Sequence, residues 1–91
     1  MQHRASKRIL LVEDEVIVAM GESMVLQTNG YDVAIEHGGQ AAIDRVARER
    51  FDLILMDIDL GPGSMDGTEA ARLILQDHDI PVVFLSSHTE P

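Results

Sequence analysis

Short strand-like segments alternate with longer segments of helical periodicity along the chain, and this alternation constrains its fold more than any other feature. The strand-like segments hold four to six residues, whereas the helical ones repeat apolar residues at three- and four-residue intervals. Strands that alternate with helices are typical of a parallel sheet with right-handed crossovers and helices on both faces. We therefore predict strands at 9–12, 31–36, 53–56 and 80–85, and helices at 15–29, after the glycine pair 38–39, and at 68–76.

The order of the strands follows from how apolar each one is. Segments 9–12 and 53–56 are wholly apolar, as expected for strands that are buried on both faces. Segment 31–36 alternates apolar and acidic residues, which is typical of a half-exposed strand at a sheet edge. The expected architecture is an α/β fold, with a flavodoxin-like doubly wound parallel sheet in the strand order 2-1-3-4.

Segment 80–85 predicts that the sheet continues beyond the fourth strand. It is apolar throughout apart from the backbone of Pro81, whereas an edge strand normally alternates or carries charges. We therefore expect a fifth strand that is missing from this chain. The predicted organisation is a polar N-terminal tail at residues 1–7 and one domain at residues 8–91, incomplete at its C-terminus.

Apolar stripes mark the predicted helices. The first carries one stripe at Val16, Ile17, Met20 and Met24. In the second we expect four apolar residues inward and three charged residues outward, namely Ala42, Ile43, Val46 and Ala47 against Arg45, Arg48 and Glu49.

Composition excludes several classes of function. The net charge of −9 and the absence of a large basic patch argue against direct nucleic acid binding. Without cysteine the chain can form neither a disulfide framework nor a thiolate zinc site. No apolar stretch approaches the length of a membrane span, so we expect no membrane partner and a cytoplasmic location.

Polar side chains stand where three predicted strands end. Glu13 and Asp14 follow the first strand, Asp57 follows the third and Ser86 follows the fourth. In the order 2-1-3-4 these strands are neighbours, and the carboxyl ends of parallel strands meet at one rim, where such sheets bind ligands. Carboxylates that crowd together repel one another unless a cation lies among them, and hard oxygen ligands fit Mg²⁺ best. A carboxylate at this position can attack phosphorus to form an acyl phosphate.

Four segments together resemble the receiver domains of response regulators, which are the phosphoacceptor modules of two-component (phosphorelay) systems. The chain is similar in particular to the chemotaxis regulators of this family. The resemblance extends over residues 8–88, nearly the whole chain. The segments are Ile9-Leu10-Leu11-Val12-Glu13-Asp14-Glu15, Leu53-Ile54-Leu55-Met56-Asp57-Ile58-Asp59-Leu60, Met65-Asp66-Gly67 and Pro81-Val82-Val83-Phe84-Leu85-Ser86-Ser87.

The resemblance implies a role for each residue at the rim. Asp57 would be the phosphoacceptor, and Glu13, Asp14, Asp57 and the backbone carbonyl of Asp59 would bind Mg²⁺. Ser86 would be the switch hydroxyl that contacts the phosphoryl group. The partner would be a sensor histidine kinase, from whose phosphohistidine the domain takes the phosphoryl group.

By the same resemblance the chain is a signalling phosphoacceptor that catalyses its own phosphorylation and dephosphorylation, and it is not a turnover enzyme. An output or kinase domain is expected elsewhere, in the same chain or on another protein. If the molecule ends at Pro91, self-association through the edge of residues 80–85 to form a homodimer is a further expectation.

The chain departs from the common family pattern in two places. Loop 60–67 is longer than usual and looks like the variant found in receivers that accompany sensor kinases. The family also has a Lys at the end of a fifth strand, which bonds the phosphoryl group, and this chain has neither that strand nor that Lys.

Two other interpretations of the acidic rim stay open. An apolar strand ending in Asp57-Ile58-Asp59, with Ser86 after a later strand, also fits a haloacid-dehalogenase-type phosphohydrolase that uses Asp57 as nucleophile. A binding module that keeps the fold but never becomes phosphorylated is the third alternative. The four histidines show no ligand spacing and are predicted to be surface residues: His3, His37, His78 and His88.

Overall fold

All seven predicted elements are present in the computed structural model, which describes residues 6–63 and 65–86. Their boundaries lie within two residues of the predicted ones, and most of the predicted tail at 1–7 lies outside the described residues. In chain order the elements are β1 (Arg8–Val12), α1 (Val16–Thr28), β2 (Asp32–Glu36), α2 (Gly39–Arg48), β3 (Leu53–Asp57), α3 (Gly67–Asp77) and β4 (Val82–Leu85).

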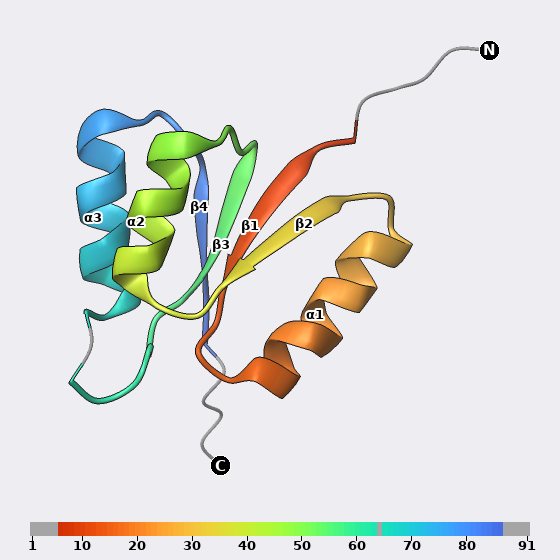
Figure 1. Cartoon of the computed structure of the whole chain (residues 1–91), viewed down its shortest axis with the longest axis horizontal. Helices are drawn as coiled ribbons and strands as arrows, with labels where there is room; N and C mark the ends of the chain where they lie inside the picture. Colours follow the sequence, from red (N-terminus) through yellow and green to blue (C-terminus); the bar gives the residue numbers. More distant parts are fainter. Residues whose placement is uncertain (1–5, 64, 87–91) are drawn as a thin grey trace.

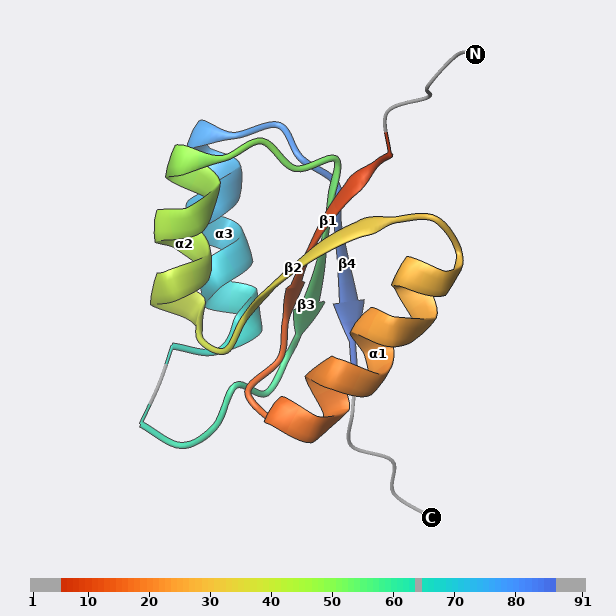
Figure 2. The ribbon, with the colours of Figure 1, turned by 45° about the vertical axis from the view of Figure 1, so that its right-hand side comes forward.

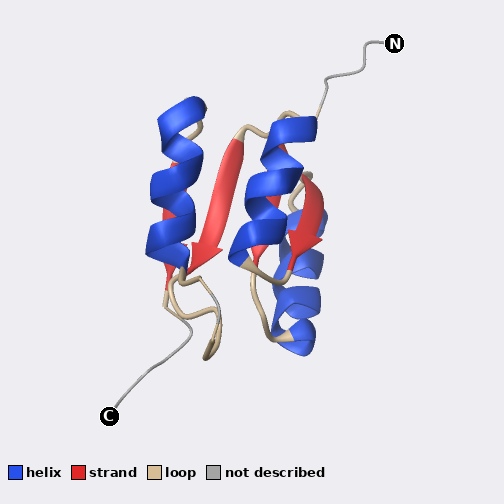
Figure 3. Ribbon diagram, turned by 60° about the vertical axis from the view of Figure 1, so that its left-hand side comes forward, coloured by secondary structure: helices blue, strands red, loops and turns tan. Residues whose placement is uncertain are grey.

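The sheet has the predicted topology. Its four strands are parallel and lie in the order β2-β1-β3-β4 (Figure 1). The register places Leu11 beside Leu55 and Asp57 beside Leu85. Because all strands run the same way, their carboxyl ends meet at one rim together with the loops that follow them (Figure 3).

Helices cover the two faces of the sheet unequally. The pair α2 and α3 packs on one face, and α1 is the helix of the described residues that lies on the other (Figure 2). The main hydrophobic core lies on the α2 and α3 side, and its buried members are Leu10, Val12, Ala34, Ala42, Val46, Phe51, Ile54, Met56, Leu60, Ala70 and Ile74. Within residues 6–63 and 65–86, no helix has the length and apolarity that crossing a membrane requires.

The prediction for the inward face of α2 was wrong at one residue. Ala42 and Val46 are buried and Ile43 is half-buried, but Ala47 is exposed. Ala47 follows Val46 by one position, which turns it about 100° around the helix and out of the contact with the sheet. Among the residues predicted to face outward, Arg45 is half-buried because it forms ion pairs with Glu36 and Glu49.

The apolar stripe of α1 is not the face that packs on the sheet. Its members Val16, Ile17, Met20 and Met24 are 54% to 84% exposed. The fully buried residues of this helix are Ala19 and Ser23, which are small. Helix α1 therefore meets the sheet through a narrow seam and leaves its larger apolar side chains outside.

Strand β4 lies at the sheet edge, although its uniform apolarity predicts an interior strand. Within the described part of the chain it pairs only with β3. Its central residues Val83 and Phe84 are 46% and 44% exposed. The strand begins after Pro81, which has no N–H to donate but accepts a hydrogen bond from the Ile54 N–H at 2.9 Å.

Gly67 sets how closely α3 approaches the end of β3, and this closeness generates a prediction. A Cβ atom at position 67 would overlap the backbone carbonyl oxygen of Asp57 and come within 2.9 Å of the Met56 Cγ atom. Gly67→Ala should therefore lower the free energy of unfolding by about 1–3 kcal/mol, because backbone must shift to relieve the overlap. Urea denaturation followed by circular dichroism measures the change.

Gly21→Ala is the matched control. Gly21 lies inside α1, and a Cβ atom at this position would meet no neighbouring atom within 4 Å. Alanine should therefore raise the free energy of unfolding by about 0.5–1 kcal/mol, because it favours the helix more than glycine does. Equal effects of the two substitutions would contradict a close approach at Gly67.

Candidate functional site

Three carboxylates gather at the carboxyl end of the sheet. Glu13 and Asp14 follow β1 directly, and Asp57 is the last residue of β3. One oxygen from each lies within 4.8 Å of the others, so the predicted acidic cluster is present. Ser86 stands at the same rim, one residue after Leu85, the register partner of Asp57. The Ser86 side chain is exposed, whereas Glu13 and Asp57 are each 1% exposed.

Hydrogen bonds from backbone N–H groups close in sequence orient the two buried carboxylates. Glu13 Oε2 accepts a hydrogen bond from the Glu15 N–H at 3.1 Å. Asp57 Oδ1 accepts one from the Asp59 N–H at 3.2 Å. In both cases the N–H lies two residues beyond the carboxylate, so the turn that ends each strand also fixes the rotamer of its acid.

Electrostatics at the rim favour either a proton or a cation. Burial is the largest cause that raises the pKa of Glu13 from 4.5 to about 7. The hydrogen bond and negative charge of Asp57 act in the same direction, and the Glu15 N–H opposes them. Burial and the charge of Asp57 also raise the pKa of Glu22, on α1. The negative potential of the cluster thus extends to the neighbouring helix.

The loop after β3 folds back toward the cluster. Gly61 adopts a left-handed φ of 96°, and a Cβ atom there would lie 3.2 Å from Asp14 Oδ2. Its N–H donates to Asp59 Oδ1 at 3.1 Å, so the Asp59 side chain holds the loop. Leu60, 3% exposed, anchors this loop in the core.

The start of α3 supports the same loop from the other side. The Gly67 N–H donates to the Ile58 carbonyl at 2.8 Å, immediately beyond Asp57. Asp66 caps the helix by accepting a hydrogen bond from the Glu69 N–H at 2.9 Å. Asp66 and Gly67 therefore have a structural role beside the site.

His37 contacts the site although sequence analysis assigned it to the surface. It is exposed, but its Nδ1 atom lies 2.8 Å from the backbone carbonyl oxygen of Glu13. His37 directly follows β2, whose carboxyl end lies at the same rim as the other strands. Inspection of all four strand ends, rather than three, could have found this residue.

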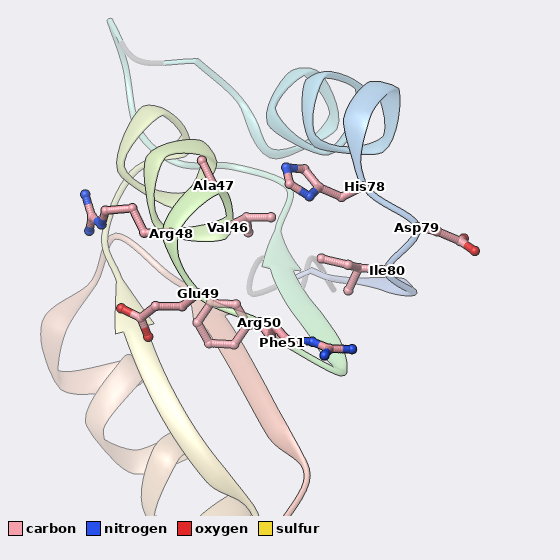
Figure 4. Close-up of a pocket in the computed structure, with 9 residues that line it drawn as sticks. All are labelled: Val46, Ala47, Arg48, Glu49, Arg50, Phe51, His78, Asp79 and Ile80. Atoms are coloured by element: carbon pink, nitrogen blue, oxygen red, sulfur yellow. The ribbon is translucent and has the colours of Figure 1, made fainter.

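A hollow of about 430 Å³ lies far from the acidic cluster. It is lined by residues around the C-terminal ends of α2 and α3 and before β3 and β4 (Figure 4), among them Phe51, His78 and Ile80. These segments lie at the amino end of the sheet, opposite the rim that carries the carboxylates. The hollow therefore takes no part in chemistry at Asp57.

The donor set at the rim fits a hard divalent cation. Carboxylate oxygens are the ligands that Mg²⁺, Ca²⁺ and Mn²⁺ prefer, and a cation would remove the repulsion that contributes to the raised pKa of Glu13. A buried aspartate held at a strand end beside such a cation site is also suited to nucleophilic attack.

Comparison with known families gives one match that covers most of the chain. Residues 9–91 match the response regulator receiver domain. The match does not support the haloacid-dehalogenase-type alternative.

Individual relatives agree with this family. The DNA-binding response regulator MtrA of Mycobacterium tuberculosis is 36% identical over 84 residues, which are 92% of this chain and 36% of that protein. This chain thus spans about a third of the length of the curated relatives it matches.

Solved structures share both fold and sequence with the chain. The N-terminal domain of a response regulator/sensory box/GGDEF 3-domain protein from Carboxydothermus hydrogenoformans is 48% identical, with a TM-score of 0.86 over 93% of this chain and 68% of that one. The BeF3-activated N-terminal receiver domain of Klebsiella pneumoniae RstA is 32% identical, with a TM-score of 0.83 over 92% and 70% of the two chains. The chain therefore belongs to the response regulator receiver domain family of two-component signalling proteins.

Proposed function

We propose that this receiver domain takes a phosphoryl group onto Asp57 from the phosphohistidine of a sensor histidine kinase, with Mg²⁺ bound at the rim. The observation that carries the proposal is the cluster of Glu13, Asp14 and Asp57, whose oxygens lie within 4.8 Å of one another at the end of the sheet. One aspartate of this cluster ends a buried strand, where its position is fixed by the core beneath it.

Each rim residue has a distinct task in this proposal. A carboxylate oxygen of Asp57 forms a bond to phosphorus while the bond from phosphorus to the kinase's histidine nitrogen breaks. The Asp59 N–H holds the attacking carboxylate in orientation. Glu13, Asp14, Asp57 and the backbone carbonyl of Asp59 would hold the Mg²⁺, which supplies positive charge against the phosphoryl oxygens.

Ser86 is the proposed switch residue. It follows β4 beside Asp57 and is exposed, and its hydroxyl would turn toward a phosphoryl oxygen on Asp57. Such a turn would also move the end of β4. Phosphorylation of Asp57 would thereby alter the surface that a partner protein contacts.

The wider role of the protein is also a proposal. A sensor kinase as phosphoryl donor, self-catalysed dephosphorylation and an output or kinase domain elsewhere are inferred from membership of the family. A homodimer is inferred from the apolar edge of residues 80–85, and a cytoplasmic location from the lack of an apolar stretch of membrane-spanning length. MtrA is a DNA-binding response regulator. For this chain, whose net charge is −9, we propose no direct contact with nucleic acid.

Phosphorylation at Asp57 is the most direct test. After incubation with acetyl phosphate and Mg²⁺, the intact mass should increase by one phosphoryl group. Asp57→Asn should abolish the increase, because an amide is a far weaker nucleophile than a carboxylate. Asp44→Asn, on the exposed side of α2, is the matched control and should retain the increase, because Asp44 lies outside the acidic cluster.

Two results would count against the assignment of Asp57 as the phosphoacceptor. A phosphoryl group that still appears on Asp57→Asn would place the acceptor elsewhere. Sustained metal-dependent hydrolysis of p-nitrophenyl phosphate, with no lasting mass increase, would instead favour the phosphohydrolase interpretation.

The raised pKa of Glu13 predicts how stability depends on pH without metal. A carboxyl whose pKa rises from 4.5 to about 7 on folding favours the folded state fully below pH 4.5, and this contribution is lost as the pH rises to 7. Glu13→Gln should therefore match the wild type near pH 4.5 and exceed its stability at pH 8 by about 3 kcal/mol. Thermal unfolding in chelator at both pH values measures this difference.

Mg²⁺ should narrow the difference in stability between the two proteins. At pH 8 the wild type should gain about 2.7 kcal/mol at a Mg²⁺ concentration 100 times the dissociation constant, and Glu13→Gln should gain less. Asp44→Asn, on the exposed side of α2, serves as the control and should behave as the wild type. An equal Mg²⁺ response in wild type and Glu13→Gln would exclude Glu13 from the cation site.

A further inference from the structure

His37 contacts the backbone of the acidic rim from a neighbouring strand. It is the first residue after β2, and its Nδ1 atom lies 2.8 Å from the backbone carbonyl oxygen of Glu13. A carbonyl oxygen can only accept a hydrogen bond, so the Nδ1 atom must carry the proton in this contact. The imidazole is therefore a donor to the rim, and this donation needs no charge on the ring.

The carbonyl that His37 contacts belongs to the peptide group between Glu13 and Asp14. A peptide group is planar, so the direction of its carbonyl also fixes the direction of its N–H. The orientation of this plane sets how the chain leaves Glu13 and how it enters Asp14. Both residues contribute a carboxylate oxygen to the cluster that also includes Asp57. A hydrogen bond to this peptide group thus acts on two of the three acids at once.

The end of β2 contacts the backbone of Glu13 on both sides of its Cα atom. The Glu13 N–H donates to the Glu36 carbonyl at 3.0 Å, one residue beyond the paired residues of β1 and β2. The Glu13 carbonyl accepts from the His37 side chain. A substitution removes the second of these hydrogen bonds and not the first, because only the second has a side-chain donor.

Packing fixes the turn that carries His37. Gly38 and Gly39 follow it and begin α2. A Cβ atom at Gly39 would lie 3.1 Å from the Ala70 Cβ atom and 3.2 Å from the Met65 Sδ atom. The start of α2 therefore lies close against α3 and against the loop that follows β3. His37 extends from a support that the core holds in place.

The three carboxylates need such a restraint to stay together without a metal. They repel one another, and rotation of the peptide group between Glu13 and Asp14 would let these two acids turn apart. The hydrogen bond from His37 opposes this rotation. Because His37 is exposed, water can replace it as a donor, but a water molecule is not attached to β2 and leaves the peptide group free to turn.

We propose that His37 is a positioning residue of the cation site, which holds the peptide group between Glu13 and Asp14 so that both carboxylates face one Mg²⁺. The inference rests on the proposed binding of Mg²⁺ at the rim and adds a residue that acts through the backbone. Groups that orient metal ligands from behind commonly determine metal affinity.

Two substitutions of similar shape separate this hydrogen bond from the other properties of His37. His37→Asn keeps an N–H donor at the same number of bonds from the backbone as Nδ1, whereas His37→Leu has no donor. In calorimetric titrations of the 91-residue chain with Mg²⁺ at pH 8, His37→Leu should raise the dissociation constant about three- to tenfold, the effect of one hydrogen bond. His37→Asn and the control Asp44→Asn should bind Mg²⁺ as the wild type does.

Stability without metal distinguishes positioning from a merely structural role. In chelator at pH 8, the free energy of unfolding of His37→Leu should equal or exceed that of the wild type, because loss of the restraint relieves repulsion among the acids. A contact that only held the fold together would give the opposite result. Urea denaturation followed by circular dichroism measures the change.

Nuclear magnetic resonance tests the contact itself in the metal-free protein. At pH 8 the imidazole nitrogen signals of His37 should show a neutral ring with its proton on Nδ1, since the carbonyl of Glu13 selects that tautomer. A ring protonated on Nε2 instead would remove the contact on which the inference depends.

The Mg²⁺ titrations can overturn the inference in two further ways. Equal affinity in His37→Leu and the wild type would show that the hydrogen bond does not act on the site. Equal losses in His37→Asn and His37→Leu would assign the effect to the imidazole as a ligand or a charge. In both cases the wild type binds Mg²⁺, so the proposed cation site stands. A wild type that binds no Mg²⁺ would instead overturn the cation site and this inference together.

Discussion

Mutual repulsion among three carboxylates at the carboxyl end of the sheet is the constraint on which the rest of this structure depends. Glu13 and Asp57 are almost completely buried, and one oxygen from each lies within 4.8 Å of an oxygen of Asp14. Such an arrangement is unfavourable without a proton or cation, and the pKa of Glu13 accordingly rises to about 7. The fold must therefore hold the acids together by other means, and those means lie in the strands and in the loop after β3.

Parallel topology supplies most of that support. Strands β1 and β3 are central and adjacent, and their apolar residues Leu10, Leu11, Ile54 and Met56 are fully buried. The acids that follow these residues cannot separate unless the core moves. Gly67 adds a second restraint, because α3 begins against the backbone of Asp57 at a distance that no side chain would permit. Stability from the core thus maintains an arrangement of like charges that is unfavourable by itself, as is common at functional sites.

Sequence analysis predicted what depends on periodicity and missed what depends on local geometry. Strand order and the meeting of Glu13, Asp14 and Asp57 follow from apolar runs and the rules for parallel sheets, and both were confirmed. The contact of His37 with the Glu13 carbonyl needs the course of the chain after β2, which periodicity does not give. The exposure of Ala47 depends on how α2 is rotated, a difference of one residue position.

Helix α1 illustrates a deeper limit of the same reasoning. Its apolar stripe predicts a buried face, yet the residues that meet the sheet are Ala19 and Ser23, while Ile17 is 84% exposed. Periodicity indicates that a helix has an apolar side, but it does not predict whether other described residues pack against that side. The uniformly apolar β4 raises the same question, since its sequence predicts an interior strand and its position is at the edge.

The acidic rim and a hollow of about 260 Å³ between α1 and the sheet are connected through β3 and β4. Leu55 and Leu85 line the hollow beside Glu22, and Leu85 is also the register partner of Asp57. The charge of Asp57 already raises the pKa of Glu22, so the two acids interact across this short stretch of β3 and β4.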